Sequence, residues 1–401
     1  MNLFWTRVLT VAAGVLLLLF LSNDFGLIDI QKTAVVAAVG IDAADEEGRV
    51  DVTAQIAVPD ASASEKAGNV TIKNAQTVGD ALAEINRKTG WYPTLVHCRL
   101  IVLGEATGGR DVFGVLNYFL RSEFVEDSCL TAMCEGRAED LLSADSPIGE
   151  LTAVAVTKVL SSEAQKTGLV CVTNLRDFAK GYYSPAASGF LPLLSALPEA
   201  ESEGGGQSAA LPCAAEEGGT GQSGKEGGKK ADVFDASRTA LFAGGRCVGV
   251  LEAAETLAFN LAATRTDFAY GSVQVQQEGE PVTYELKFKI RSKKVRLTLD
   301  GGPAALFRVR ANAQIADASR ASGVVEIAKT AFVPDFVLRA AEETLQENLR
   351  SALAKAAAGG CDLFALRQKL HRRYPAQEER YAAGLLQAAQ PVFDIRFDTV
   401  H

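Results

Sequence analysis

The order of hydrophobic and polar positions first predicts a β-hairpin near the start of the chain. Within residues 50–59, apolar residues occupy every second position, which is the period of a strand with one buried face. Residues 33–42 are also rich in valine and alanine, and the seven residues between the two segments are polar and turn-forming. We therefore expect two paired strands over residues 33–59.

The pattern downstream alternates between helical and strand periods. Residues 77–90 combine Thr77 and Asp80 in a capping-box arrangement with Gly90 as a stop signal, which predicts a helix. Such a mixture of helices and strands predicts an α+β protein. Further strands are expected over 97–104 and 129–136, and further helices over 111–122 and 148–168.

A change of composition interrupts this pattern in the middle of the chain. Residues 201–230 contain nine glycines and no aromatic residue. A segment of this kind cannot bury enough apolar surface to offset the entropy lost on ordering. We therefore predict a disordered, Gly-rich loop over residues 198–231.

The last third of the chain returns to regular patterns. Gly244 and Gly245 separate two apolar runs, which is a strong hairpin signal. The longest predicted helix covers residues 335–360, and alternating strands are expected before it and at 392–400. This order favours antiparallel sheets with helices on one face. The apolar stripe of the long helix consists of Leu338, Ala341, Leu345, Leu349, Ala352, Leu353 and Ala356.

The N-terminal segment is apolar enough to enter a membrane. Arg7 precedes an apolar run that extends to Leu21, and residues 3–21 make up 19 positions, close to the ~20 that span the hydrocarbon core. The segment could be cleaved as a signal peptide, exchanged for a lipid, or retained as an anchor. In each case the rest of the chain is exported.

Two observations favour the anchor among these three fates. The sequence after the apolar run lacks a good small-residue cleavage site, and the first cysteine, Cys98, lies far downstream. Arg7 on the inside and the acidic residues Asp24 and Asp29 on the outside agree with the charge rule. We therefore expect residues 1–22 to act as a signal anchor, with cleavage as the alternative.

Charge and cysteine usage exclude two classes of protein. The net charge is −9 and the isoelectric point is near 5.1, which argues against binding nucleic acid, since phosphate contacts need a basic surface. The seven cysteines form no C-x-x-C pair, so neither a zinc knuckle nor a redox pair is indicated. We expect most of these thiols to be buried, and we do not expect Cys129 to bond with Cys134.

No motif in the sequence indicates a catalytic, cofactor or metal site. Residues 219–226 resemble a phosphate loop, but Glu226 stands where Ser or Thr would bind magnesium, and no strand precedes the segment. The histidines at 97, 371 and 401 form no metal-binding spacing, and His97, which is expected on a strand, would face away from Cys98. The acidic runs at 45–47 and 342–343 are interpreted as solvated surfaces. We therefore expect no enzyme, cofactor or metal.

A basic strand is the one concentrated charge feature. Positions 287, 289, 291 and 293 would share one face of a strand, and this face could approach an anionic membrane surface. The solvated face of an antiparallel sheet is the favoured interpretation. The cluster consists of Lys287, Lys289, Arg291, Lys293, Lys294 and Arg296.

Four blocks of the sequence together resemble the Ger(x)C family of spore germination proteins. Residues 33–59, TAVVAAVGIDAADEEGRVDVTAQIAVP, are similar to the family's opening strands. Residues 77–105, TVGDALAEINRKTGWYPTLVHCRLIVLGE, resemble its first helix and the strand that follows. RTALFAGGRCVGVLEAAET at 238–256 and DLFALRQKLHRRYP at 362–375 resemble two later blocks in family order.

The resemblance implies a fold and a set of partners. Members of this family are elongated arrangements of about three α+β domains, which we place at 31–145, 146–268 and 269–401, with the Gly-rich loop inside the middle one. They are C-type subunits of nutrient germinant receptors on the outer surface of the spore inner membrane. Their expected partners are the A-type and B-type membrane subunits and the membrane itself, and a nutrient germinant is possible but unassigned.

One departure from the family pattern concerns the tether. Where the family has a lipobox cysteine, residues 21–34 read LSNDFGLIDIQKTA, without cysteine. An apolar helix that is retained would tether the exported domains as a lipid does, and more firmly.

The sequence thus supports two hypotheses of different classes. The first is a non-catalytic, membrane-tethered receptor subunit that works through surfaces, with the helix at 336–358 and the basic strand at 287–296 as candidates. The alternative is an exported, envelope-associated hydrolase with a site of scattered acidic residues. A deep cleft with converging carboxylates would favour the hydrolase.

Overall fold

The computed structural model describes most of the chain. The described residues are 2–22, 33–58, 66–146, 151–198, 232–277, 279–320, 323–324 and 332–399. The Gly-rich segment therefore lies outside them, apart from Pro198, which ends strand β7. The prediction of a disordered loop falls on the residues that are not described.

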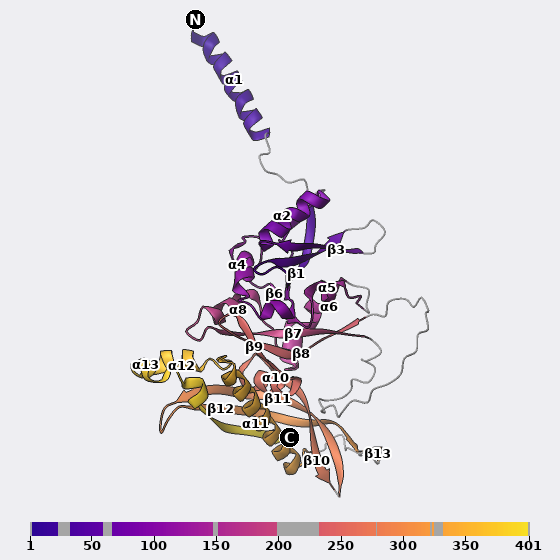
Figure 1. The fold of residues 1–401 in the computed structure, drawn as a ribbon, viewed down its shortest axis with the longest axis vertical. Helices are drawn as coiled ribbons and strands as arrows, with labels where there is room; N and C mark the ends of the chain where they lie inside the picture. Colours follow the sequence, from indigo (N-terminus) through magenta and orange to yellow (C-terminus); the bar gives the residue numbers. More distant parts are fainter. Residues whose placement is uncertain are drawn as a thin grey trace.

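The first sheet contains nine strands and forms the upper part of the body (Figure 1). Its order is β3-β2-β1-β5-β6-β7-β8-β9, and β4 pairs with β1 beyond this path. The strands are β1 (Thr33–Ala43), β2 (Val50–Val58), β3 (Lys66–Ala75), β4 (Tyr92–Thr94), β5 (Leu100–Leu103), β6 (Leu130–Cys134), β7 (Ser188–Pro198), β8 (Asp232–Ala243) and β9 (Arg246–Leu251).

The second sheet contains five strands and forms the lower part (Figure 1). Its long central strands β11 and β12 pair antiparallel, and β14 adds to β12 in parallel. The strands are β10 (Phe268–Gln277), β11 (Glu280–Thr298), β12 (Ala304–Arg320), β13 (Gly323–Val324) and β14 (Gln390–Thr399).

Helices flank both sheets. Helix α10 (Ala253–Ala263) packs on β8 of the first sheet and on β11 of the second, and it also contacts α11 (Asp335–Ala358), so it lies at their junction. The others are α1 (Asn2–Ser22), α2 (Val78–Thr89), α3 (Glu105–Gly108), α4 (Phe113–Arg121), α5 (Ala138–Ser143), α6 (Thr152–Val159), α7 (Ser162–Lys166), α8 (Leu175–Tyr182), α12 (Leu366–Arg373), α13 (Glu378–Tyr381) and α14 (Leu385–Ala388).

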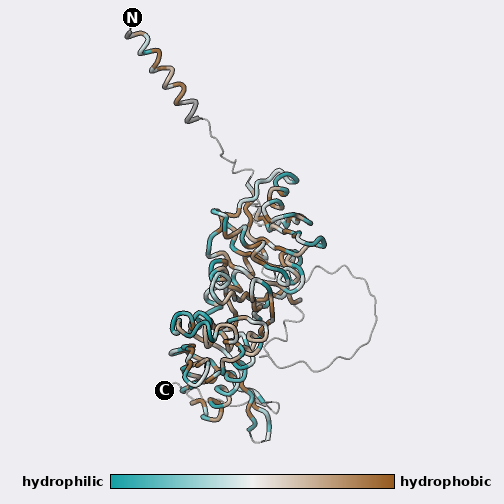
Figure 2. Tube along the Cα trace, turned by 60° about the vertical axis from the view of Figure 1, so that its left-hand side comes forward, coloured by the Kyte–Doolittle hydropathy of each residue, from teal (hydrophilic) through white to brown (hydrophobic). Residues whose placement is uncertain are grey.

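The hydrophobic cores follow this arrangement. Two clusters lie on the two faces of the first sheet, one around Ile41 and Phe119 and the other around Leu100 and Leu142. A third cluster joins α10 and α11 to the second sheet, so that Phe259 and Phe307 belong to one core. Brown, hydrophobic stretches of the chain accordingly run through the inside of both parts in Figure 2. The fold is a stack of two sheets joined through α10.

These observations confirm the α+β class and the elongated shape (Figure 1). In its described residues, 33–58, the first hairpin forms as predicted, and so does the helix that begins after Thr77, with Gly90 in a left-handed conformation at the helix end. Every member of the predicted stripe on α11 is buried. The strands of the first sheet come from both of the first two predicted domains, and the division at residue 146 stays a prediction.

Three details differ from the expectation. Both sheets are mixed, since β1, β5, β6 and β7 pair in parallel in the first sheet and β12 and β14 in the second. The segments between these strands contain helices, which supply the long crossovers that parallel pairing needs. The segment 97–104 enters its strand only at Leu100, because the backbone N–H of Cys98 closes a turn on Leu95. The helix expected over 148–168 is two helices, because Ser161 caps α7 as a new start.

The apolar leader is helical. The structure describes the backbone of α1 over Asn2–Ser22 and its side chains over residues 4–17. Within the part of the chain that the structure describes, no helix meets the length and hydropathy needed to cross a bilayer.

Candidate functional site

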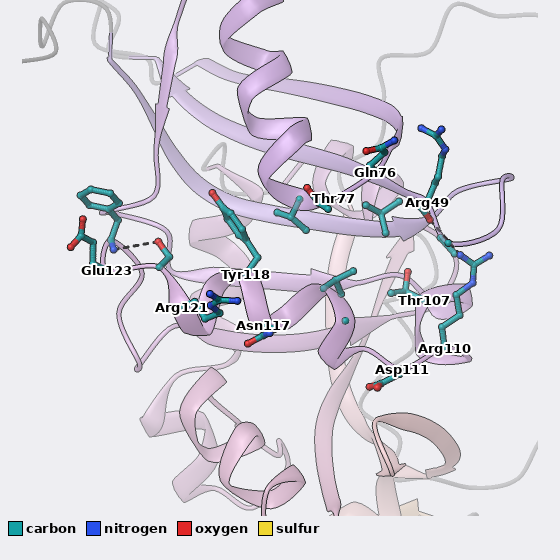
Figure 3. A pocket seen from close by; sticks show the side chains of 18 residues that line it. Arg49, Gln76, Thr77, Thr107, Arg110, Asp111, Asn117, Tyr118, Arg121 and Glu123 are labelled. Atoms are coloured by element: carbon teal, nitrogen blue, oxygen red, sulfur yellow. Dashed lines mark hydrogen bonds between the residues drawn. The ribbon is translucent and has the colours of Figure 1, made fainter. Parts of the chain in front are cut away.

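Two cavities of similar size are the candidate sites in the described part of the chain. The first, of about 790 Å³, lies beside the start of α2, the β1–β2 turn and helix α4 (Figure 3). The second, of about 780 Å³, lies at the junction of the two sheets, between α8, α10, β11 and α12. We call them the upper cavity and the junction cavity.

Three arginines give the upper cavity a basic lining. Arg49 comes from the β1–β2 turn, Arg110 from the loop before α4, and Arg121 from the end of α4. Arg49 is 2.8 Å from Glu46 and donates to the Asn74 carbonyl oxygen at 3.0 Å. These contacts hold the Arg49 side chain against its own turn. Figure 3 shows Arg121 on the other side of the cavity.

The two carboxylates of the upper cavity do not converge. Asp111 and Glu123 lie at opposite ends of it in Figure 3. Asp111 accepts a hydrogen bond from the backbone N–H of Phe113 at 3.0 Å, and its charge raises the pKa of Tyr182. The arrangement therefore lacks the paired acids that hydrolysis of a glycosidic bond requires.

The junction cavity is lined by more cationic than acidic side chains. Phe190 and Phe259 line it as an edge-to-face pair, with their ring centroids 5.0 Å apart. The cationic residues are Lys180, Arg265, Lys293, Lys294 and Lys369, and the acidic residues are Asp177 and Asp362.

Lys293 holds the end of helix α10 from inside this cavity. Its Nζ donates to the carbonyl oxygens of Asn260 at 3.3 Å and Thr266 at 3.1 Å. Burial lowers its pKa to about 8, and the nearby Asp267 opposes the shift. Since a helix C-terminus carries partial negative charge, a lysine there stabilises the helix.

Asp362 has a similar structural function at the start of α12. Its carboxylate accepts hydrogen bonds from the backbone N–H groups of Leu366 at 2.6 Å and Arg367 at 2.7 Å. Burial raises the pKa of Asp362, while these hydrogen bonds and Lys369 act in the opposite direction. Asp362 therefore caps the helix. Among the described residues of this cavity, its contacts leave no free pair of acids of the kind that the hydrolase hypothesis needs.

The predicted basic strand does not present one continuous basic face. A bulge between Ile290 and Ser292 changes the register of β11, so Lys293 turns toward the junction cavity. Lys287 lies over the rings of Phe268 and Tyr270, with its Nζ 5.5 and 5.6 Å from their centroids. The sequence pattern placed positions 287, 289, 291 and 293 on one face, and periodicity alone does not reveal the bulge.

The histidines occupy unrelated places. His97 is exposed in the turn before β5, not within a strand as expected, and His371 on α12 lies 2.8 Å from Glu378. His401 and residues 219–226 lie outside the described residues. In the described ranges, no group of three His, Cys, Asp or Glu side chains is arranged to hold a metal ion.

The cysteines are largely buried, as predicted. Five of the six in the described residues are buried, and Cys247 is half-buried. The thiols of Cys98 and Cys129 lie next to one another at the start of β5 and β6. Their proximity follows from strand pairing that the sequence pattern did not resolve.

Comparison with known proteins identifies the class. One family model, described as "Spore germination protein N-terminal domain", matches residues 27–196, and a second, "Spore germination B3/ GerAC like, C-terminal", matches residues 237–383. No curated protein matched. Among solved structures, "Crystal Structure of the GerBC protein" aligns with 16% identity and a TM-score of 0.46, covering 90% of this chain and 97% of that one.

The chain is therefore a spore germination protein. It belongs to the Ger(x)C family, whose members are germinant receptor C subunits, and its role lies in spore germination.

Proposed function

We propose that this chain is a non-catalytic, membrane-tethered subunit of a spore nutrient germinant receptor. It works on the outer surface of the spore inner membrane through contacts with A-type and B-type membrane subunits. The observation that carries the proposal is the succession of two matched family domains behind an apolar leader. The leader supplies the tether, and the two stacked sheets supply the contact surfaces.

The contacts of the charged side chains support a role in docking. In the junction cavity, Lys293 and Asp362 cap helices, and in the upper cavity Asp111 bonds to the backbone at the start of α4. The apolar stripe of α11 is buried, so this helix offers its polar face and the exposed ring of Phe336 to a partner. These contacts support a function that depends on surfaces.

Deletion in spores tests the proposal. Spores that lack the chain are expected not to respond to nutrients but to germinate with a trigger that bypasses nutrient receptors. Leu16→Arg combined with Leu17→Arg should release the chain from the membrane fraction and fail to complement, because arginine is costly in the hydrocarbon core. Leu16→Ile with Leu17→Ile is the matched control and should complement.

Two results would contradict the proposal. If the arginine variant is recovered in soluble form and still restores nutrient germination, the tether is not needed. Failure of the A-type and B-type subunits to co-purify with the functional chain would exclude the docking function.

A further inference from the structure

Five large apolar side chains are exposed at one end of the first sheet. Trp91, Tyr92, Val96, Tyr118 and Phe124 are 37–54% exposed. They lie within a span of 34 residues. Trp91 directly precedes β4, Tyr92 begins it, Val96 is in the turn that follows, Tyr118 is on α4, and Phe124 is in the loop after α4. We call this set the aromatic patch.

Proximity along the chain and a shared cavity relate the members of the patch. Trp91 and Tyr92 are adjacent, and the Trp91 carbonyl oxygen accepts a hydrogen bond from Asn86 of α2 at 3.2 Å. The phenol of Tyr92 is close enough to that of Tyr118 to raise the pKa of Tyr118, where burial is the larger cause. Tyr118 and Phe124 both line the upper cavity. Tyr92, Tyr118 and Phe124 therefore border one surface, and Trp91 and Val96 flank Tyr92 closely along the chain.

This surface lies where the chain arrives from its leader. Strand β4 pairs in parallel with the first residues of β1, and Thr33 is opposite Tyr92. Helix α1 ends at Ser22, and the 10 intervening residues can span at most roughly 40 Å. Whenever α1 is inserted in the bilayer, this length of chain keeps the patch within a few nanometres of it, about 4 nm for the connection itself.

The residue types of the patch match the chemistry of a lipid interface. Tryptophan and tyrosine concentrate at the level of the headgroups, because each ring has an apolar body and a polar edge. A charged surface would bind anionic lipids in a salt-dependent way instead. Here Lys88 is already paired with Glu84 at 2.7 Å, and Arg87 lies 3.9 Å from the same carboxylate. The arginines of the upper cavity, which the patch borders, add a salt-dependent attraction, and apolar contact is the part of the binding that we expect to persist in concentrated salt.

We propose that the aromatic patch docks on the lipid headgroup region of the membrane that holds α1, so that the first sheet rests against the bilayer. This proposal depends on the tethering proposed above. It names the lipid surface as the partner of the patch and fixes which end of the body faces the membrane. The second sheet then extends away from the bilayer (Figure 1).

The chain contains two tryptophans, and they report on the two proposals separately. Trp5 lies in α1 and Trp91 in the patch. Trp91→Phe leaves Trp5 as the sole reporter of the anchor, and Trp5→Phe leaves Trp91 as the sole reporter of docking. Each full-length chain is reconstituted in vesicles of phosphatidylcholine and phosphatidylglycerol with or without brominated acyl chains, which quench nearby tryptophans.

We expect both reporters to lose emission in brominated vesicles, and the Trp91 emission to shift to shorter wavelength. The loss at Trp91 should persist in concentrated salt, because apolar contact is not screened. Quenching of Trp5 without quenching of Trp91 would overturn the docking proposal and leave the tether intact. Absence of quenching at Trp5 would overturn the tether. If the Trp91 emission shifts to shorter wavelength only when the membrane subunits are added, the patch binds a protein partner. That result would overturn the lipid proposal.

Two controls make the result specific. Phe336→Trp, in a chain with Trp5→Phe and Trp91→Phe, places the reporter at the start of α11, beside the second sheet, where no quenching is expected. Quenching there as strong as at Trp91 would mean adsorption without orientation and would refute the proposal. In the Trp5→Phe chain, Tyr92→Ser with Phe124→Ser should reduce the quenching of Trp91, whereas Tyr270→Ser, which replaces an exposed tyrosine on β10, should not.

Discussion

Asp42 accepts a hydrogen bond of 2.8 Å from the backbone N–H of Ala138, although 96 residues separate them in the chain. Its second oxygen accepts another from the backbone N–H of Glu139 at 3.0 Å. The carboxylate is 3% exposed and thus caps helix α5 from the end of β1. Burial raises the pKa of Asp42, and the two backbone bonds and Arg137 act against that increase.

We expect Asp42→Ala to destabilise the first sheet by about 3 kcal/mol, because it leaves two buried N–H groups without acceptors. Urea unfolding of the full chain measures this change. Asp45→Ala, in the exposed β1–β2 turn, is the control and should stay within about 0.5 kcal/mol of the parent chain. Equal stability of the two variants would show that the cap contributes nothing.

The sequence predicted the secondary structure near Asp42 but not this contact. The hairpin and the helix at Thr77 follow from periodicity and capping signals that act over a few residues. The partner of Asp42 depends on the parallel pairing of β1 with β5 and of β5 with β6, which brings residue 138 beside β1. Periodicity contains no information about such pairing, so neither the cap nor the mixed sheets could be foreseen.

The candidate cavities were beyond prediction for a related reason. The junction cavity combines residues from α8, β11 and α12, which are distant in the sequence and carry no shared motif. The bulge in β11 that turns Lys293 into it has no sequence signal among the alternating residues 284–290. By contrast, the family was recognisable, because its blocks are continuous segments in a fixed order.

An ion pair between an exposed lysine and a buried glutamate connects α11 to α10. Lys355 of α11 lies 2.7 Å from a carboxylate oxygen of Glu255, whose other oxygen accepts from Ser351. The backbone N–H of Glu252 also donates to this carboxylate. We expect Glu255→Gln to cost ~2 kcal/mol, because a charged acceptor shared by three donors is lost. Glu347→Gln, at an exposed position of α11, is the control. A double-mutant cycle with Lys355→Met should give a coupling energy of about 1 kcal/mol, and a value near zero would contradict the pairing.

Close packing at Gly359 links the end of α11 to β9. A Cβ at this position would lie 2.7 Å from the Val248 Cγ2 atom, while the backbone φ of −79° is open to any residue. Gly359→Ala should therefore destabilise by about 2 kcal/mol through overpacking, and Val248→Ala should restore part of the loss. In contrast, Gly114→Ala in α4 meets open space and should stabilise by roughly 0.5 kcal/mol. Thermal unfolding of the three variants checks this order of stability. A decrease in the stability of Gly114→Ala would contradict the argument.

Lys293 makes the stability of the junction depend on pH. Its pKa falls from the usual 10.5 to about 8 on folding because the ammonium group is buried. Between these two values the unfolded chain holds a proton that the folded chain has released. Folding stability contributed by this site therefore rises with pH over that interval and is constant below it.

Lys293→Met should abolish this contribution. The difference in unfolding free energy between the parent chain and Lys293→Met is expected to grow in favour of the parent as the pH rises from about 8 toward 10.5. Subtracting the unfolding free energy of the variant from that of the parent chain cancels the titration of the other groups, which both chains share. Lys289→Met, at an exposed position on the same strand, is the matched control and should run parallel to the parent chain. A difference that does not change with pH would mean that the Lys293 ammonium is as well solvated in the folded chain as in the unfolded one, and the junction cavity would then be open to water at the end of α10.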